Sequence, residues 1–466
     1  MSLESVLRNV LQDHFSEENV KKTGNPKVDR EAIEKRFEEI IQKCESSSFD
    51  FSKMKNLAIT QKKYLHQNKR RYIKSFLASS DEDILSICVK RIIDRNFKLR
   101  FPNRNRICKD LFNILPAMLQ MSDFTIYRFD FSDYFNSVNS EYVFEKFIRS
   151  KIKKRDELNL LSTYVKQTIF AYAGLRPSNS IAEIIALEFD NNIKKRLYNK
   201  GLIFYERFID DGLIIINCHI SNDELDSILK DAINCTFHDS AIEIRCTISN
   251  NVKINHSKSR YISGKNLQAN ASNNFDFLGY SFSLKRDKSN CKNCIVYGIT
   301  EEKRLKYMNR LEKFFRSCYC DKSNEDEYQN FILLEHRIRC FVTRQVYVQR
   351  RLKSYTWKVK GFIANYGELR YFAGTNMLEP ETDNFLKTVI VKAFDNLKLN
   401  TTKPPFLNNY CLLENLKKNK TLLFVRGIGY DKPSLERLCT KVHINLCKKS
   451  YDGLVRDYLI KMKVGY

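Results

Sequence analysis

A strand, a tight turn and a second strand can be inferred from residues 205–216, which read Tyr205-Glu206-Arg207-Phe208-Ile209-Asp210-Asp211-Gly212-Leu213-Ile214-Ile215-Ile216. Two apolar runs of β type flank the adjacent carboxylates Asp210 and Asp211, and Asp-Gly is a strong hairpin signal. Both acids are therefore expected to project from the tip of a hairpin. Taken alone, such a tip is more often an ordinary polar turn.

A third acid, Asp130, ends another apolar β run, Ile126–Phe129. Carboxylates at the ends of two neighbouring strands can hold a pair of magnesium ions about 4 Å apart. This arrangement transfers a nucleotide to a 3′ hydroxyl. The sequence therefore predicts a site with two Mg²⁺ ions at Asp130, Asp210 and Asp211.

The composition favours a folded protein with a polyanionic partner. The 466 residues predict about three units and include 80 Lys and Arg against 55 Asp and Glu, a formal net charge of +25. A basic surface of this size suits nucleic acid. The 43 % hydrophobic and 12 % aromatic content excludes a disordered basic tail.

No run is long and apolar enough for a membrane span, and the charged start does not resemble a signal peptide, so a cytoplasmic location without a membrane partner is expected. The fourteen cysteines are then expected to be reduced thiols. Zinc at Cys291, Cys294, Cys318 and Cys320 stays open, although the one-residue gap of the second pair is unusual.

The periodicity along the chain predicts an α+β fold. Residues 1–50 are expected to form a helical N-terminal extension, and the strongly basic segment Lys90–Lys109 suits phosphate or a solvated helix face. Short β runs alternate with helical stretches between about 120 and 285. From about 300 the pattern is mostly helical, including Glu327–Lys353.

Five segments, in this order, resemble motifs A to E of the reverse transcriptases: Phe129-Asp130-Phe131-Ser132-Asp133-Tyr134-Phe135, Gly174-Leu175-Arg176-Pro177-Ser178-Asn179-Ser180-Ile181-Ala182-Glu183, Phe208-Ile209-Asp210-Asp211, Asn255-His256-Ser257-Lys258-Ser259 and Phe277-Leu278-Gly279-Tyr280. The resemblance covers residues from about 60 to 285. With Ala182-Glu183 and the helical C-terminus, the chain is most similar to bacterial defence-associated and abortive-infection reverse transcriptases.

The resemblance implies roles for individual residues. Asp130, Asp210 and Asp211 would be the catalytic, metal-binding carboxylates, and Lys258 would protonate or neutralise the leaving pyrophosphate. Phe135 matches the bulky gate against a 2′ hydroxyl, unless it is a core aromatic. The other residues expected to bind the nucleotide are Arg104, Arg106, Ser132, Asp133, Tyr134 and Ser180, with Lys98 and Arg100 as alternatives to the two arginines. The residues expected to grip the primer are Phe277, Leu278 and Gly279.

Motif B departs from the family pattern. Leu175-Arg176-Pro177 replaces the usual Pro-Gln-Gly or similar second glycine, in a loop that shapes the template base. Arg176 would clamp a particular RNA or take the place of the template. The predicted product is therefore a restricted or repetitive DNA.

A basic and aromatic stretch, Arg344–Lys360, has no acid. Its alternating cations and rings suit nucleic acid beside a polymerase thumb, with Arg350, Arg351 and Lys353 as expected contacts. A core helix with cations extending to solvent is an equal alternative.

The sequence thus predicts a right-hand polymerase with residues 1–50 as the extension, 51–285 as fingers and palm, and 286–466 as a helical thumb and C-terminal region. Its expected function is RNA-directed DNA synthesis in antiphage defence, with deoxynucleoside triphosphates as substrates and RNA and DNA as partners. This function is also compatible with a further partner, either a noncoding RNA or a second protein of the same defence system. Template-independent or protein-primed nucleotidyl transfer at the same site is the first alternative. A non-catalytic RNA-binding scaffold is the second.

Overall fold

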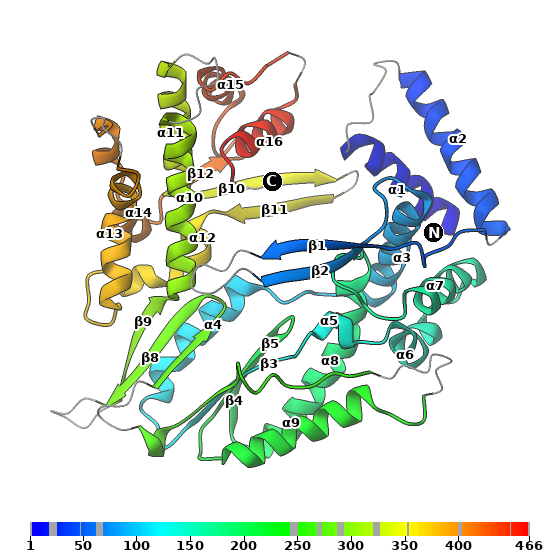
Figure 1. Cartoon of the computed structure of the whole chain (residues 1–466), viewed down its shortest axis with the longest axis horizontal. Coiled ribbons are helices and arrows are strands. Elements are labelled where there is room, and N and C mark those ends of the chain that lie inside the picture. Colours follow the sequence, from blue (N-terminus) through cyan, green and yellow to red (C-terminus); the bar gives the residue numbers. More distant parts are fainter. Residues whose placement is uncertain are drawn as a thin grey trace. The chain divides into compact units, whose positions relative to one another are not determined.

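The computed structural model describes residues 2–17, 26–46, 48–61, 69–242, 250–267, 273–286, 293–319, 327–351, 354–398, 403–447 and 449–464. They form two compact units, in which the chain of the first is interrupted by a helix of the second. The first unit contains the described residues before 104 together with 121–266, and the second contains 104–120 together with those from 267 onward. Both units mix helices and strands (Figure 1), whereas the sequence predicts a helical region from residue 286 onward.

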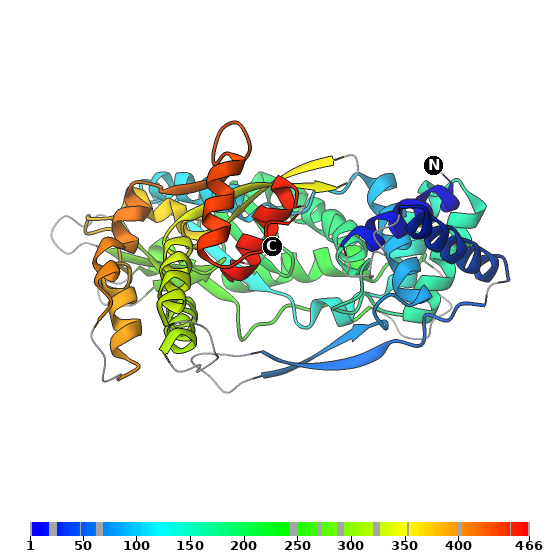
Figure 2. The same cartoon turned by 90° about the horizontal axis from the view of Figure 1, so that it is seen from above.

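The first unit is built around an antiparallel sheet of four strands in the order β4-β5-β3-β6. Its helices and strands are α1 (Leu3–Glu17), α2 (Pro26–Glu45), β1 (Lys55–Gln61), β2 (Lys69–Ser75), α3 (Asp81–Phe97), β3 (Thr125–Asp130), α5 (Tyr134–Ser137), α6 (Ser140–Val143), α7 (Arg155–Thr168), α8 (Ser178–Leu197), β4 (Leu202–Phe208), β5 (Asp211–Ile216), α9 (Asn222–Phe237) and β6 (Arg260–Ser263). A π-helical turn, Phe144–Ile148, continues α6. Strands β1 and β2 form a separate long hairpin (Figure 2).

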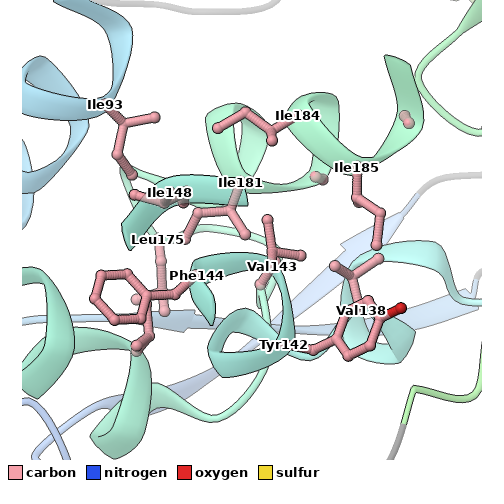
Figure 3. Packing of buried hydrophobic residues seen from close by; sticks show 14 of the residues in the cluster. Ile93, Val138, Tyr142, Val143, Phe144, Ile148, Leu175, Ile181, Ile184 and Ile185 are labelled. Carbon is pink, nitrogen blue, oxygen red and sulfur yellow. The ribbon is translucent and has the colours of Figure 1, made fainter. Parts of the chain in front are cut away.

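Helix α8 is anchored in the core of this unit. Its isoleucines recur at helical spacing, so that Ile181 and Ile185 share one buried side. Figure 3 shows them among Val138, Val143 and Leu175. Burial of aliphatic side chains stabilises the unit by about 1.5–3 kcal/mol per residue, and it gives the sheet a rigid neighbour.

The second unit contains two three-stranded sheets, with strand orders β7-β8-β9 and β11-β10-β12. Its helices and strands are α4 (Arg104–Met118), β7 (Asn273–Phe277), β8 (Tyr280–Arg286), β9 (Asn293–Ile299), α10 (Glu301–Tyr319), α11 (Glu327–Phe341), β10 (Arg344–Arg351), β11 (Ser354–Lys360), α12 (Phe362–Tyr366), α13 (Pro380–Asp395), α14 (Leu412–Lys417), β12 (Thr421–Phe424), α15 (Lys432–Lys441) and α16 (Tyr451–Lys461). Among the helices that the structure describes, none is long and apolar enough to cross a membrane.

The helix predicted for Glu327–Lys353 is wrong beyond Phe341. Helix α11 ends there, Thr343 Oγ1 donates to the carbonyl of Arg339 at 2.7 Å, and residues 344–351 form β10. The alternation of buried Gln345 and Tyr347 with half-buried Val346 and Val348 is the two-residue period of a strand. Pairing with β11 and β12 therefore prevails over helical continuation.

Candidate active site

The predicted carboxylates meet at one edge of the β4-β5-β3-β6 sheet. Asp130 is the last residue of β3 and lies opposite Asp211, the first residue of β5. Asp210 lies in the two-residue turn between β4 and β5, and its carbonyl accepts a hydrogen bond from the Phe131 amide at 2.9 Å. Antiparallel pairing of β3 with β5 therefore brings together acids that are 80 residues apart in the sequence.

Asp130 and Asp210 are electrostatically coupled. Asp130 is buried, and burial together with the negative charge of Asp130 raises the pKa of Asp210. Two carboxylates in this position repel each other, and a divalent cation bound between them would remove the repulsion. Their oxygens are the donors that magnesium prefers.

Asp211 differs from Asp210 in its partner. Its Oδ1 accepts a hydrogen bond from Arg128 Nε at 2.9 Å, and Arg128 also donates to the Lys258 carbonyl at 2.7 Å. Arg128 therefore forms an ion pair with Asp211. Within the described residues no group of three or more His, Cys, Asp or Glu side chains is already arranged as a metal cluster. Binding of metal by Asp130, Asp210 and Asp211 stays a prediction.

Lys258 lies at the same edge, as the motif predicts. Its Nζ is 2.6 Å from Asp130 Oδ2, and its side chain is half exposed. A turn fixes this position, because the Asn255 amide donates to the Asp130 carbonyl at 2.7 Å and the Lys258 amide donates to the Asn255 carbonyl at 3.0 Å. The lysine therefore neutralises Asp130 in this structure.

The turn that carries Asp210 is strained. Ile209 has φ 64°, a left-handed conformation that a β-branched residue rarely adopts. Its carbonyl accepts a hydrogen bond from Arg207 Nη1 at 2.8 Å. Strain of this kind persists only where the surroundings enforce it.

Arg207 is a buried residue that the sequence analysis missed. Its guanidinium donates to both oxygens of Glu183, at 3.1 and 3.3 Å, and to both oxygens of Asp190, at 2.9 and 3.0 Å. Both acids lie on α8, so that Arg207 connects the hairpin to the helix of motif B. The available signal was its place in β4, two residues after Tyr205 and therefore on the same inward-facing side, where a charged residue requires partners.

A second missed residue is Arg71 of β2. Its positive charge opposes the rise in the Asp210 pKa. It belongs to an exposed run on the β1–β2 hairpin, where it pairs with Ile59. The basic composition of residues 50–120 was the signal for it, but the sequence does not show that this stretch forms a hairpin.

Several residues predicted to bind the nucleotide have contacts inside the first unit, and their role toward a nucleotide stays a prediction. The Ser132 amide donates to the Lys253 carbonyl at 2.9 Å, and buried Tyr134 donates its hydroxyl to the Ala182 carbonyl at 2.9 Å. Ser180 is fully buried and donates to Asp94 Oδ1 at 2.5 Å. Asp133 adopts φ 46° and begins α5. The half-buried Phe135 follows Tyr134, with ring centroids 5.9 Å apart.

The basic segment Lys90–Lys109 also serves the fold. Lys90 pairs with Asp94 at 2.5 Å, Arg91 pairs with Asp13, and Arg95 pairs with Glu157 at 2.6 Å. These acids come from α3 itself, α1 and α7. At these three positions, internal ion pairs replace the predicted phosphate contacts.

The motif B loop packs against β2. Gly174 has φ 105°, and a Cβ there would lie 2.4 Å from the Lys74 carbonyl oxygen, so the position requires glycine. Arg176 Nε lies 3.4 Å from Asp83 Oδ1 and its side chain is half exposed. A template-like role for Arg176 stays a prediction.

Arg104 belongs to the second unit, and its role toward a nucleotide stays a prediction. Its guanidinium donates to the carbonyls of Leu278 and Asn365, both at 2.6 Å, and lies over the Tyr280 ring. Arg106 lies on the same helix, α4. Arg104 therefore holds the β7–β8 turn within its own unit.

The predicted primer hairpin is present as a hairpin. Leu278 and Gly279 both have positive φ, 52° and 84°, in the turn between β7 and β8. Phe277 is buried and therefore packs inside the unit rather than presenting its ring. A role for this turn in holding a primer stays a prediction.

Some predicted residues cannot be located. Lys353, Cys291 and Cys320 lie outside the described residues, and Arg350 and Arg351 are described only as part of β10. Cys294 and Cys318 lie within the described residues. The zinc alternative is therefore neither supported nor contradicted.

Gly212, which follows the paired acids, is required by packing. It lies opposite Phe129 in the β3–β5 ladder, and a Cβ on Gly212 would lie 2.2 Å from Phe129 Cζ. Phe129 is fully buried and has little room to move. Because Gly212 has no side chain, the Phe129 ring packs directly against the backbone of β5 beside the carboxylates.

Gly212→Ala is expected to lower the free energy of unfolding by about 1–3 kcal/mol, because it overpacks this contact. Chemical denaturation followed by circular dichroism measures the change. Gly367→Ala is the control, since a Cβ at Gly367 meets nothing within 4 Å. Equal stability of the two variants would contradict the packing argument.

Comparisons with known proteins give a limited result. No protein-family model and no curated protein matches the chain. Among solved structures, telomerase from Candida albicans in complex with a TWJ fragment of telomeric RNA is 11 % identical, with 89 % of this chain and 62 % of that chain covered and a TM-score of 0.37. The corresponding telomerase from Candida tropicalis is 11 % identical, with 88 % and 64 % covered and a TM-score of 0.33. This chain spans less than two thirds of either telomerase chain, and TM-scores below 0.5 do not establish a shared fold.

Proposed function

We propose that this chain is a DNA polymerase of the reverse transcriptase type, which adds deoxynucleotides to a 3′ hydroxyl at Asp130 and Asp210. The observation that supports the proposal is the coupled carboxylate pair on adjacent antiparallel strands, with Asp210 on a strained hairpin tip. The motif order in the sequence supports the same function. The right-hand arrangement of fingers, palm and thumb is part of this proposal.

Asp130 and Asp210 would hold magnesium, with Asp211 adjoining them. When bound, magnesium lowers the pKa of the attacking hydroxyl and neutralises charge on the triphosphate and the leaving pyrophosphate. The fit rests on the donor chemistry of the two carboxylates and on their mutual repulsion, which is expressed in the raised pKa of Asp210.

The cationic side chains at this edge would serve the triphosphate. Lys258, whose Nζ lies 2.6 Å from Asp130 Oδ2, would give an ammonium proton to the leaving pyrophosphate. Arg71 would bind phosphate oxygens through its guanidinium. Both assignments use charge that the site already holds next to its carboxylates.

The narrower assignment to bacterial antiphage defence is supported by the sequence resemblance. The proposal includes a cytoplasmic location and RNA and DNA as partners, with a noncoding RNA or a second defence protein as a further partner. The formal net charge of +25 is consistent with polyanionic partners. The restricted or repetitive product predicted from motif B is also part of it.

The test is incorporation of labelled deoxynucleotides by the purified chain with magnesium, using primed heteropolymeric RNA, primed DNA and no added nucleic acid in separate reactions. Sequencing the products distinguishes faithful copies from repetitive or untemplated DNA. Binding of Mn²⁺, measured by calorimetry, is the second readout and should be lost in Asp130→Asn. A chain that neither incorporates nucleotides nor binds the metal would be a non-catalytic scaffold.

Phe135→Ala is expected to raise the efficiency of ribonucleotide relative to deoxynucleotide incorporation about tenfold or more, because the ring would no longer obstruct a 2′ hydroxyl. The ratio of kcat/KM values for the two substrates measures the effect. Phe147→Ala is the matched control, since Phe147 is also half-buried against the same core. An unchanged ratio in a folded Phe135→Ala protein would make Phe135 a packing residue.

A further inference from the structure

The β10–β11 hairpin of the second unit exposes a row of large apolar side chains. Tyr355, Trp357 and Val359 are 69 %, 56 % and 42 % exposed. They alternate along β11, so that they share one face of the hairpin, which we call the aromatic face. Residues two apart on a strand lie about 7 Å apart, which leaves space for a planar group beside each ring.

The opposite face of the same sheet is packed. Tyr347 of β10 and Phe424 of β12 lie opposite each other and are buried in a cluster with side chains of α15 and α16. This contact anchors one side of the hairpin. The aromatic face is therefore held out on a supported strand pair.

The hairpin also extends past the strand that supports it. Strand β12 pairs only with residues 344–347, whereas β11 pairs with β10 as far as Arg351 (Figure 1). Trp357 and Tyr355 lie opposite Val348 and Arg350, beyond the last pair with β12. The exposed rings thus occupy the projecting half of the hairpin.

The charge around this face is positive. Residues 344–360 contain no Asp or Glu. Arg344 lies on the same side of β10 as Val346 and Val348, because the three are spaced two residues apart. Burial together with the positive charge of Arg370 lowers the pKa of Arg344. Arg370 in turn lies 4.6 Å from the ring centroid of Tyr371, which is 61 % exposed. Two guanidinium groups that repel each other are favourable partners for an anion.

We propose that the aromatic face of the β10–β11 hairpin binds single-stranded nucleic acid, with bases stacked on Trp357 and Tyr355 and backbone phosphates at Arg344 and Arg370. Stacking on exposed rings requires unpaired bases, whereas a duplex hides the faces of its bases. The surplus of cations favours a phosphate backbone over a protein strand added to the β11 edge. This surface belongs to the second unit and the carboxylates belong to the first, and the inference does not depend on catalysis.

The decisive measurement uses the fluorescence of Trp357, which is the only tryptophan in the chain. The full-length protein is titrated with a 20-nucleotide oligothymidylate, without magnesium or nucleotide triphosphates. The expected result is quenching that saturates with binding. An abasic oligomer of the same length should bind more weakly without equal quenching, because it offers phosphates but no bases.

Variants separate stacking from charge. In anisotropy titrations of labelled oligothymidylate, Trp357→Ala should weaken binding about tenfold, Trp357→Phe should largely restore it, and Tyr198→Ala, an exposed aromatic of the first unit, should have no effect. Arg344→Gln with Arg370→Gln should reduce the slope of log affinity against log salt by about 1.4. The control is Lys417→Gln with Lys432→Gln, two solvent-accessible lysines of α14 and α15.

Three results would overturn the proposal. They are unchanged Trp357 fluorescence at saturating oligonucleotide, wild-type affinity in Trp357→Ala, and equally effective competition by a duplex of the same length. Because no reaction is measured, an inactive Asp210→Asn chain should still show the quenching. Loss of polymerase activity and loss of this binding are therefore distinguishable.

Discussion

Asp210→Asn is expected to reduce magnesium-dependent deoxynucleotide incorporation by at least about a thousandfold, because it removes a metal-binding charge while nearly preserving shape. The same substitution removes the repulsion from Asp130 that raises the Asp210 pKa, so the folded protein should not lose stability. Initial rates of incorporation and thermal unfolding are the two measurements.

Asp211→Asn provides the matched comparison. Asp211 is already paired with Arg128, so its loss should affect the local ion pair as well as any metal. We expect a smaller loss of activity than in Asp210→Asn, and complete loss in the double variant. Equal activity of the double variant and the wild-type chain would exclude this site.

Arg207→Met is expected to lower the free energy of unfolding by about 3–5 kcal/mol, because it leaves Glu183 and Asp190 without their buried partner. The variant also removes the hydrogen bond to the Ile209 carbonyl that supports the Asp210 turn. Urea unfolding measures the first effect. Nucleotide incorporation by the folded fraction measures the second.

The control for this prediction is Arg149→Met, which breaks an exposed i,i+4 pair with Glu145 and should change stability by less than about 0.5 kcal/mol. Adding Glu183→Gln to Arg207→Met should recover part of the loss, since it removes one buried, uncompensated charge. Equal unfolding free energies of Arg207→Met and Arg149→Met would show that the network contributes little.

The pH dependence of Arg207→Met follows from the same network. Burial raises the pKa of Glu183, and Arg207 opposes that rise. Without Arg207 the folded state should bind a proton at Glu183 more readily than the unfolded state. Stability relative to wild type should therefore fall as pH rises from about 5 to about 8.

The fold was most predictable where local signals were strong. The runs Thr125–Phe129 and Leu213–Ile216 are strands because β-branched and aromatic residues follow one another there. The position of the turn differs from the prediction, because Ile209 and Asp210 form it and the Asp211-Gly212 pair lies in β5. Residues 344–351 were predicted as helix because their apolar residues are also compatible with a helical period. Their partner strand β12 is about 75 residues away in the sequence, and no local pattern reports that pairing.

The site was predictable to a similar extent. Motifs mark Asp130, Asp210 and Lys258, and the structure places them at one sheet edge, while their catalytic roles stay predictions. Arg71 and Arg207 were missed because their roles depend on neighbours from other elements. Conversely, Ser180 and Arg104 carry suitable groups for a nucleotide, but Asp94 and the Leu278 carbonyl already use those groups.

The sequence by itself determined the chemistry available to this protein: its carboxylates at strand ends, its surplus of cations and the alternation that makes its strands. The tertiary fold determines which of these groups already form ion pairs or hydrogen bonds inside the protein. A carboxylate or a guanidinium looks the same in any sequence, but whether it is a ligand or a structural ion pair depends on the charge that folding places within a few ångströms of it. Antiparallel pairing of β3 with β5 places Asp130 beside the turn that carries Asp210. The tertiary fold also brings Arg207 of β4 to Glu183 and Asp190 of α8, which accept its hydrogen bonds.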